Sequence, residues 1–303
     1  MNNKQIVWIA GGDGLVGNHL QSVIDKSKFD VYTLSRKKPK SSQFIQWDTE
    51  KKVIYSDQKP DHIINLAGAG IADARWTDQR KKILVSSRVD SALTLKAYLQ
   101  EKGIRPDTYI SASAVGYYGD QKDRILTEES KPGNEFMSDC CIAWEDAAKS
   151  TGNLCAKTVL LRIGIVLSTQ DGALPKMLMT KSVGVFNYFG KGAQYHPWIH
   201  IDDLAKMIIF AIESPKVKGI YNAAAPQQIT NKEMMQEIMT ALDSNGVLLP
   251  APSFGLRILL GEMANVVLNS NRVDVQKMLD TGFTFQYTKC GEAVRDLVVK
   301  QMY

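Results

Sequence analysis

Residues 6–17 read Ile-Val-Trp-Ile-Ala-Gly-Gly-Asp-Gly-Leu-Val-Gly, and this stretch decides the fold. Its apolar start, rich in β-branched residues, predicts a buried strand, and the apolar spacing that follows predicts a helix over 15–24. Glycines between a strand and a helix let the backbone approach a pyrophosphate, and the free N–H groups of the helix start face that anion. Glycines alone would mark only a tight turn, but this context favours a dinucleotide site. The expected contacts are Gly11, Gly14, Leu15, Val16 and Gly17.

The end of the second predicted strand, residues 29–36, indicates which dinucleotide is bound. In this architecture an acidic residue about 20 residues past the glycines holds the ribose 2′-hydroxyl of NAD, whereas an arginine accommodates the 2′-phosphate of NADP. No carboxylate stands at the strand end here, where the chain has Ser35 and Arg36. A guanidinium can hold a phosphate through two N–H groups. The alternative is a solvated basic turn; we expect NADP, held by Ser35 and Arg36.

The composition is that of a globular protein large enough to bury a sizeable core. The chain has 303 residues, of which 44% are hydrophobic and 23% charged, and its net charge is +5. That small excess suits an anionic cofactor, and without a long basic run it does not indicate a nucleic-acid partner. We expect no signal peptide, and no apolar run of the sequence reaches membrane-spanning length. We therefore expect a cytoplasmic protein with no membrane partner.

No metal site is expected. The four cysteines have no metal-ligand spacing, and the chain has only four histidines, so reduced thiols are the default. The cysteines are Cys140, Cys141, Cys155 and Cys290.

Strands and helices alternate along the first half of the chain. The predicted strands span 43–48, 61–68, 107–113 and 157–161, and the predicted helices span 76–100 and 136–150. This alternation predicts βαβ crossovers and an α/β Rossmann fold, in which helices cover both faces of a doubly wound parallel sheet. Ala67 and Gly68 are small residues at the end of a buried strand, so we expect the cofactor to lie over their backbone. Ser111, near the end of the next strand, is a further expected cofactor contact.

The pattern of the chain loosens after about residue 165. We expect residues 1–165 to form the dinucleotide-binding core. Residues 166–303 should form a smaller mixed region that covers the carboxyl ends of the strands and builds a substrate pocket. Segments within 198–242 are expected to return to the core, and a strand is predicted near 282–285.

Motifs spread over nearly the whole chain carry a family resemblance. They lie at residues 10–17, 65–68, 75–77, 86–88, 111–119, 144–145, 161–164, 190–192, 198–204, 219–222, 250–252, 260–263, 270–272 and 282–283. With them the chain resembles the extended and atypical short-chain dehydrogenase/reductases. The closer similarity is to the sugar-nucleotide-epimerase-like subgroup with an extra C-terminal domain of unknown function. The resemblance implies a Rossmann fold with bound NADP(H), and much less about chemistry, because a fold does not fix a function.

The chain departs from that family's catalytic pattern. The resemblance implies a Ser, a Tyr and a Lys four residues after the Tyr; the Tyr exchanges a proton with the substrate and the Lys lowers the Tyr pKa. Ser113 fits the serine position. Counting back from Glu145 puts Met137 at the tyrosine position and Cys141 at the lysine position. Methionine has no ionisable proton and a neutral thiol has no positive charge, so neither can replace that pair.

Three interpretations stay open. In the first, Tyr117 or Tyr118 donates the proton, with aromatic packing as the alternative role. In the second, His196 or His200 acts from the substrate loop, with a structural hydrogen bond to a helix start as the alternative for His200. In the third, the chain binds NADP without rapid turnover.

The sequence thus predicts an NADP(H)-dependent oxidoreductase or nucleoside-diphosphate-sugar-epimerase-like enzyme acting on a small polar substrate. The predicted catalytic residues are Ser113 and Tyr117, and the predicted substrate contacts are Arg75 and His200. Arg88 and Arg162 are further candidates for an anionic substrate. The alternative is a catalytically slow NADP(H)-binding regulatory or scaffold protein with a protein partner. A monomer or homodimer is expected.

Overall fold

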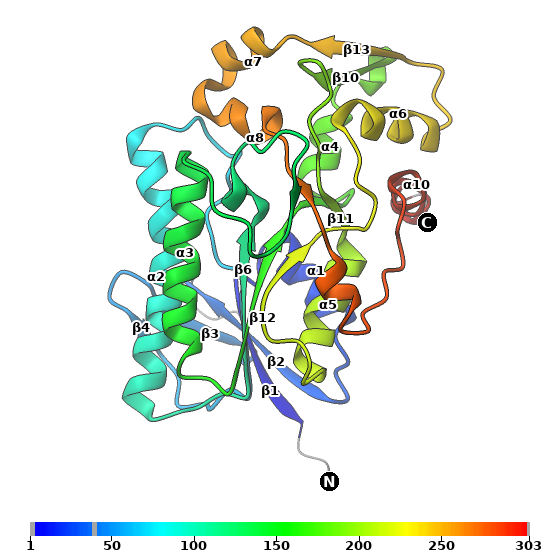
Figure 1. Cartoon of the computed structure of the whole chain (residues 1–303). Helices are drawn as coiled ribbons and strands as arrows, with labels where there is room; N and C mark the ends of the chain where they lie inside the picture. Colours follow the sequence, from blue (N-terminus) through cyan, green and yellow to red (C-terminus); the bar gives the residue numbers. More distant parts are fainter. Residues whose placement is uncertain (1–3, 38–40, 302–303) are drawn as a thin grey trace.

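An eight-stranded sheet lies at the centre of the molecule (Figure 1). The structure, a computed structural model, describes residues 4–37 and 41–301. The strand order is β12-β8-β6-β5-β1-β2-β3-β4, and the pairings are parallel except that of β3 with β4. The strands are β1 (Gln5–Ala10), β2 (Phe29–Ser35), β3 (Phe44–Asp48), β4 (Val53–Ile54), β5 (His62–Asn65), β6 (Thr108–Ala114), β8 (Lys157–Ile163) and β12 (Gly219–Ala223). The expected α/β doubly wound sheet is confirmed.

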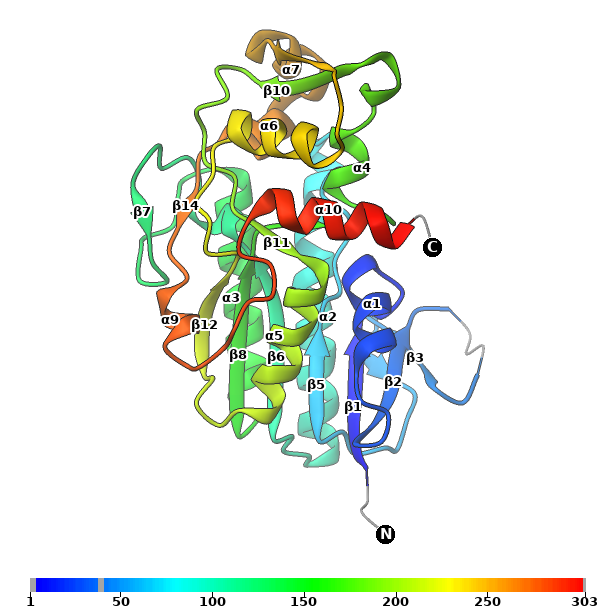
Figure 2. The same ribbon diagram turned by 90° about the vertical axis from the view of Figure 1, so that its right-hand side faces the viewer.

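Helices cover both faces of this sheet (Figures 1 and 2). One face carries α1 (Leu15–Val23) and α5 (Ile201–Glu213), and the other carries α2 (Asp78–Lys102) and α3 (Phe136–Gly152). Strand β1 shows why both faces must be covered, because its alternate side chains point to opposite layers. Val7 and Ile9 belong to the core under α1 and α5, whereas Trp8 and Ala10 belong to the core under α2 and α3. All four are fully buried, as expected of a central parallel strand.

Local hydrogen bonds fix where the long helices begin and end. The Thr77 hydroxyl accepts a hydrogen bond of 3.1 Å from the Arg80 N–H at the start of α2. That helix ends at Gly103 in the left-handed conformation, with φ of 60°, which glycine adopts without steric cost. Helix α6 (Asn231–Ala241) begins with a capping box between Thr230 and Glu233.

Successive strands are added to the sheet in one direction from β1 to β3 and in the opposite direction from β5 onward. The point between β1 and β5 where this order reverses positions the candidate site. From β1 the chain moves outward through β2 and β3, then crosses back to β5 on the other side of β1. The loops after β1 and β5 therefore meet at the carboxyl edge of the sheet. A Cβ atom on Gly11 would lie 2.7 Å from the Leu66 carbonyl carbon, so the two loops are in direct contact.

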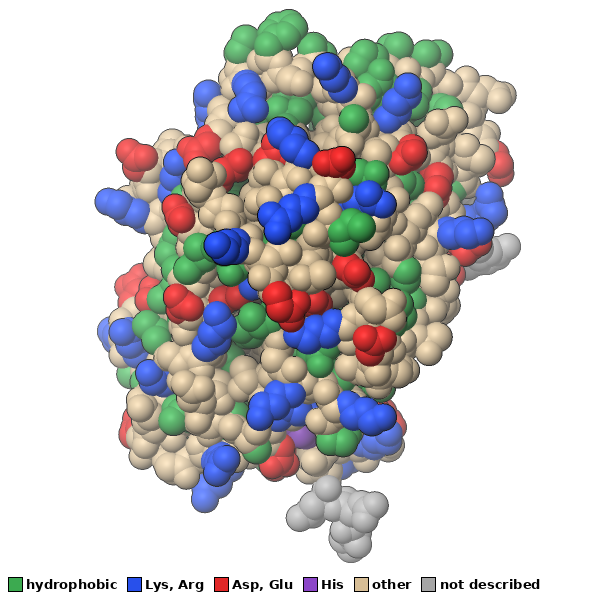
Figure 3. Space-filling model, viewed as in Figure 1, with side chains coloured by type: hydrophobic (Ala, Val, Ile, Leu, Met, Phe, Trp, Pro, Cys, Tyr) green, Lys and Arg blue, Asp and Glu red, His purple; other side chains and the backbone are tan. Residues whose placement is uncertain are grey.

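A smaller mixed region covers this edge, as the upper part of Figure 1 shows. Its strands are β7 (Ile125–Leu126), β9 (Ile165–Leu167), β10 (Val185–Phe189), β11 (Trp198–His200), β13 (Val247–Ala251) and β14 (Arg272–Val273). Its helices are η1 (Val115–Tyr118), α4 (Ala173–Met177), η2 (Lys181–Val183), α6, α7 (Ser253–Leu260), η3 (Gly261–Ala264), α8 (Asn265–Leu268), α9 (Gln276–Leu279) and α10 (Cys290–Gln301). Figure 3 shows hydrophobic side chains gathered at the upper end of this region. Among the described residues, no helix is long and apolar enough to cross a membrane.

The strand predicted near 282–285 is wrong. Residues 283–285 belong to no helix or strand and pair with no strand among the described residues. Phe283 and Phe285 are both buried against the core under α5, with their ring centroids 5.0 Å apart, and Phe283 also meets Phe210. The alternating aromatic residues therefore reflect side-chain burial without a backbone ladder.

Candidate functional site

The glycines after β1 differ in what surrounds them. A Cβ atom on Gly17 would lie 2.4 Å from the Gly11 carbonyl oxygen, so this glycine lets α1 pack closely against the turn. Gly14 is exposed and has an ordinary φ of −83°, and a Cβ there would meet only the Gly11 oxygen, at 3.3 Å. Gly14 is also the N-cap of α1, and no side chain caps the helix. The Gly14 N–H donates to the Gly11 carbonyl oxygen at 3.1 Å, so the N–H groups available to an anion at the start of α1 are those of Leu15 and Val16.

The side chains expected to select the dinucleotide lie at the end of β2. Ser35 is buried, and its hydroxyl accepts a hydrogen bond of 3.2 Å from the Lys37 N–H. Arg36 is exposed just beyond the strand. Thr33, two residues before Ser35, donates to Gln21, which in turn donates to the Gly12 carbonyl oxygen at 2.8 Å. The end of β2 is thus tied to the glycine turn through side chains.

The second loop of the edge, residues 66–71, is fastened by side chains of α2. The Ala69 N–H donates to the Ser87 hydroxyl at 3.0 Å, and Arg88 donates to the Ala69 carbonyl oxygen at 3.1 Å. A Cβ atom on Gly68 would lie 3.1 Å from the Arg88 guanidinium carbon, so a side chain there would press on Arg88. Ala67 is half-buried and Gly68 exposed, as a backbone platform requires.

Ser111 does not take the place expected for a cofactor contact. Its side chain is fully buried, and its hydroxyl donates to the Ala112 carbonyl oxygen at 3.0 Å. The hydroxyl thus serves the interior of β6. The sequence could not indicate this, because alternate residues of a strand look alike until the sheet defines its two faces.

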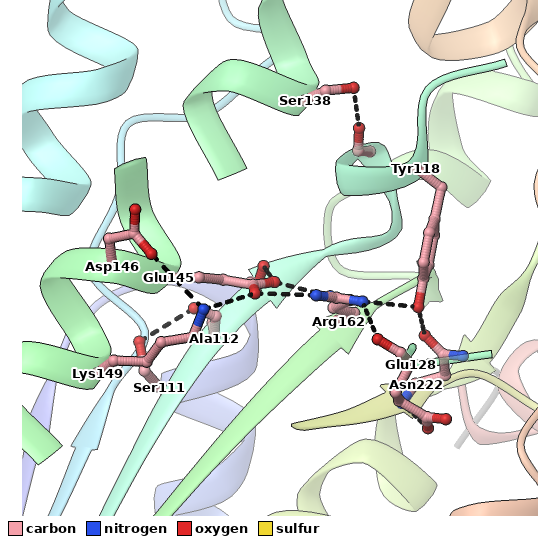
Figure 4. A network of polar contacts seen from close by, with 12 residues as sticks. Ser111, Ala112, Tyr118, Glu128, Ser138, Glu145, Asp146, Lys149, Arg162 and Asn222 are labelled. Atoms are coloured by element: carbon pink, nitrogen blue, oxygen red, sulfur yellow. Dashed lines mark hydrogen bonds and ion pairs between the residues drawn. The ribbon is translucent and has the colours of Figure 1, made fainter. Parts of the chain in front are cut away.

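A buried polar network lies behind the candidate site and crosses three neighbouring strands (Figure 4). Ser113 of β6, Arg162 of β8 and Asn222 of β12 are register partners. Glu145 of α3 accepts hydrogen bonds from Arg162 Nε at 2.7 Å and Nη2 at 3.0 Å, and from the Ser113 hydroxyl at 2.8 Å. Arg162 and Glu145 are each only 1% exposed. The proton of Ser113 is therefore directed to Glu145 and away from the edge of the sheet.

The two adjacent tyrosines of η1 have different roles. Tyr118 is fully buried; its hydroxyl accepts from Arg162 at 3.0 Å and donates to the Asn222 side-chain oxygen at 2.7 Å. Burial raises the pKa of Tyr118 to about 12, against the opposing charge of Arg162. Tyr117 is only partly buried, and the Arg162 guanidinium lies 3.5 Å from its ring centroid. Among the described residues its hydroxyl has no hydrogen-bond partner, so of the two tyrosines only Tyr117 keeps a hydroxyl for a ligand.

Met137 and Cys141 of α3, which stand at the positions of the family's catalytic Tyr and Lys, face the loop that carries Tyr117. A Cβ atom on Gly116 would lie 3.5 Å from Met137 Cβ and 4.0 Å from Cys141 Sγ. Cys141 is fully buried, and burial raises the pKa of its thiol to about 12. It therefore stays neutral at physiological pH and supplies neither a nucleophile nor a charge.

Breaking the buried ion pair should strongly destabilise the fold. In Glu145→Ala the Arg162 charge would be left without its carboxylate in the interior, which costs about 3–5 kcal/mol. Urea denaturation should show this loss in the free energy of unfolding. The double variant Glu145→Leu/Arg162→Met, which removes both charges, should recover much of it. A Glu145→Ala cost below about 1 kcal/mol would mean that the pair contributes little.

His200 does not take the place expected for a substrate contact. It is the N-cap of α5 and fully buried, and its Nδ1 accepts a hydrogen bond of 3.0 Å from the Asp202 N–H. Its ring stacks on Tyr287 with centroids 3.9 Å apart, and its Nε2 lies 3.5 Å from a carboxylate oxygen of Asp296 in α10. This burial corrects the prediction that His200 contacts the substrate. His200 has the alternative role instead, a structural hydrogen bond at the start of α5.

His196 is not placed to transfer protons at neutral pH. One ring nitrogen lies 3.1 Å from the Val267 carbonyl oxygen and the other 3.3 Å from the Asn231 amide nitrogen. A neutral ring that donates to Val267 and accepts from Asn231 satisfies both contacts. Complete burial lowers the pKa of His196 to about 4.

This burial predicts a loss of stability in mild acid. The unfolded chain takes up a proton at His196 below pH 6.5, whereas the folded chain does so only near pH 4, so stability falls as the pH drops through that window. By pH 4.5 the loss should reach about 2–3 kcal/mol in the free energy of unfolding. The His196→Gln variant has no group to titrate there. Its stability should fall less between pH 7 and pH 4.5, and equal falls in both proteins would contradict the prediction.

The three candidate arginines, Arg75, Arg88 and Arg162, differ in whether they are exposed to a substrate. Arg162 is paired with Glu145 in the interior, and Arg88 is buried with its guanidinium 4.9 Å from the Trp144 ring centroid. Arg75 is exposed and lies against Gly261 of η3, where α2 begins beneath the C-terminal region. Only Arg75 remains open to a substrate. The structural role of Arg162 had one signal in the sequence, since a charge inside an apolar strand needs a buried partner.

A doubly wound sheet with an uncapped glycine turn at its reversal point defines a Rossmann-type nucleotide-binding protein. The chain belongs to the NAD dependent epimerase/dehydratase family, which matches residues 7–224. A second family, the domain of unknown function DUF1731, matches residues 251–297. The expected family and its extra C-terminal domain are both confirmed.

Named relatives agree with this assignment over nearly the whole chain. The chain is 33% identical to epimerase family protein Mb2239 of Mycobacterium bovis, over 95% of this chain and 96% of that protein. It is 32% identical to epimerase family protein YfhF of Bacillus subtilis, with 96% and 97% covered.

Two solved structures are similar to the whole chain. Human epimerase family protein SDR39U1, solved with NADPH, has a TM-score of 0.90 at 28% identity, with 97% of this chain and 99% of that chain covered. A nucleoside-diphosphate sugar epimerase from Corynebacterium glutamicum has a TM-score of 0.78 at 29% identity, covering 97% of this chain and 58% of that one. The NADPH in the human structure supports the cofactor expected from the sequence.

Proposed function

We propose that the chain is an NADP(H)-dependent oxidoreductase or nucleoside-diphosphate-sugar-epimerase-like enzyme. It would act on a small polar substrate without the Tyr-x-x-x-Lys pair. The observation that carries this proposal is the uncapped start of α1 at the exposed Gly14. A side chain at Gly14 would occupy the space that a pyrophosphate needs, so the turn fits a dinucleotide. The human relative solved with NADPH supports the same cofactor.

The residues around the turn divide the binding work. The pyrophosphate would be held by the turn at Gly11 and Gly14 and by the first free N–H groups of α1. The 2′-phosphate would be held by Arg36. The bound dinucleotide would lie over the backbone at Ala67 and Gly68. When bound, the nicotinamide supplies a hydride donor or acceptor. Tyr117 is the proposed proton donor, because its hydroxyl is uncommitted, and Ser113 would act only through Glu145, as a positioning residue.

The choice of dinucleotide can be tested at Arg36. A charge-assisted hydrogen bond between its guanidinium and the 2′-phosphate is worth about 1.5–3 kcal/mol. Arg36→Ala should therefore weaken NADPH binding by roughly ten- to a hundredfold and leave NADH binding almost unchanged. Titration of the cofactor's fluorescence measures both affinities. The exposed cation Lys59 precedes β5, at the amino edge of the sheet, so Lys59→Ala is a matched control that should change neither affinity. Equal affinities for the two dinucleotides in the unmutated protein would refute the role given to Arg36.

The regulatory or scaffold alternative is favoured by a specific observation. Met137 and the neutral, buried Cys141 face the loop of Tyr117 where the family's proton relay would stand. If no residue replaces that relay, the protein would bind NADPH and turn it over slowly. Absorbance at 340 nm, followed with NADPH and a panel of carbonyl and sugar-nucleotide substrates, separates the two functions. Rapid bleaching supports an enzyme, and tight binding with none supports the alternative.

A further inference from the structure

The end of the C-terminal region carries an unusual apolar surface. Of thirteen large hydrophobic side chains that are exposed among the described residues, eight lie within residues 176–191 and 247–266. We call these two segments the tip surface. Its exposed apolar side chains are Met179, Val183, Val247, Leu249, Phe254, Ile258, Leu259 and Val266. Five of them are at least 70% exposed. Apolar residues exposed singly are normal on a protein surface, but a cluster of this size needs an explanation.

Most elements of the tip surface bury no residue; the exceptions are β10, with the buried Phe186, and η3, with the buried Ala264. Helices η2, α7 and α8 contain no buried residue, and strand β13 contains none either. An isolated helix as short as α7 is marginal in water without the burial of an apolar face. In Figure 3 hydrophobic side chains form the upper edge of the molecule, where the surface projects outward. The tip surface therefore has the character of a contact face whose partner lies outside the chain.

The charge of the tip surface restricts that partner. The two segments contain four cations and one acid, Glu262, which itself contacts Lys81 of α2. The cations are all exposed: Lys176, Lys181, Lys191 and Arg257. A second copy placed face to face would bring two cationic surfaces together, which costs free energy. The partner should instead be anionic and able to accept protruding apolar side chains.

We propose that the tip surface docks on an anionic lipid bilayer. Apolar side chains that project from the end of a molecule can enter the boundary between headgroups and acyl chains, while neighbouring lysines and arginines meet anionic headgroups. The sequence predicts no membrane partner because it lacks a spanning segment. Docking at the bilayer surface needs no such segment.

Vesicle sedimentation of the full chain tests this inference. The protein should sediment with vesicles of phosphatidylcholine containing about one third phosphatidylglycerol, and much less with phosphatidylcholine alone. High salt should release it, because the attraction to the headgroups is screened. No binding to the anionic vesicles would overturn the proposal.

Variants assign the binding to the tip surface. Ile258→Asp/Leu259→Asp and Lys181→Glu should each weaken partition into anionic vesicles by about tenfold or more. Ile125→Asp changes an exposed residue of β7 outside the tip surface and should leave binding unchanged. NADPH affinity, measured on every variant, reports that the fold is intact. Undiminished binding by the double variant would overturn the proposal. So would a dimer of the unmutated protein that this variant dissociates, since a second copy would then cover the face.

Discussion

The Gly14→Val variant should lose NADPH binding by at least about a thousandfold and remain folded. The backbone at Gly14 has a φ of −83° and a ψ of 172°, which valine adopts readily, and only the Gly11 oxygen lies near the new Cβ. The side chain would instead point to where the pyrophosphate must approach the helix start. Isothermal titration with NADPH and thermal unfolding measure the two effects separately.

Two other glycines give the contrasting results. Gly255→Ala, in α7, meets only Pro252 at 3.7 Å; it should leave binding unchanged and raise stability by at most about 1 kcal/mol. Gly17→Ala would place a Cβ 2.4 Å from a backbone oxygen and should lower stability itself. If Gly14→Val bound NADPH with unchanged affinity, the glycine-rich stretch would be only a turn.

In the enzyme that we propose, Tyr117→Phe should lower kcat by about a hundred- to ten-thousandfold, the contribution of a positioned general acid. The substitution removes only the hydroxyl, so the ring contact with Arg162 and the affinity for NADPH should persist. Tyr55→Phe, at an exposed tyrosine that follows the outermost strand β4, is the matched control. Steady-state kinetics on one substrate compare the three proteins.

The result also separates Tyr117 from the other two predicted residues. Ser113→Ala should lower kcat less than Tyr117→Phe, because Ser113 donates to Glu145 in the interior. His200→Ala should act mainly on stability, through the lost N-cap of α5. An unchanged kcat in Tyr117→Phe would remove Tyr117 as proton donor, and an activity that survives all three changes would put the reaction elsewhere.

The fold was largely predictable because its signals are local. The apolar runs of β1 and β5 and the helical spacing of α2 and α3 each fall within one short window of sequence. The strand predicted at 282–285 was wrong because its signal is also only local. The alternation of these residues is typical of a strand, but no strand in the part of the chain that the structure describes pairs with them, and only the folded molecule can decide that.

For the candidate site, the sequence allowed us to predict the glycine-rich turn but not the buried polar network behind it. The glycines, set between a predicted strand and a predicted helix, indicated a phosphate-binding turn from sequence. The bonds among Ser113, Glu145 and Arg162 join β6, α3 and β8, and such partners meet only when the sheet is assembled. His200 was ambiguous because a histidine beside two aspartates suits a substrate loop and a helix N-cap equally well.

The place of β12 at the end of the sheet bears on how the chain can be divided. This strand comes after β9, β10 and β11 of the upper region, yet it returns to pair with β8 along Val159 to Ile163. A fragment ending at residue 165 would keep every other strand of the large sheet, but it would lose β12 and also α5, which covers one face of the sheet. It would expose β8, with its apolar side chains and unpaired backbone groups, as an open edge. Such an edge invites intermolecular strand pairing, so the nucleotide-binding half would tend to aggregate when expressed without the segment that closes it.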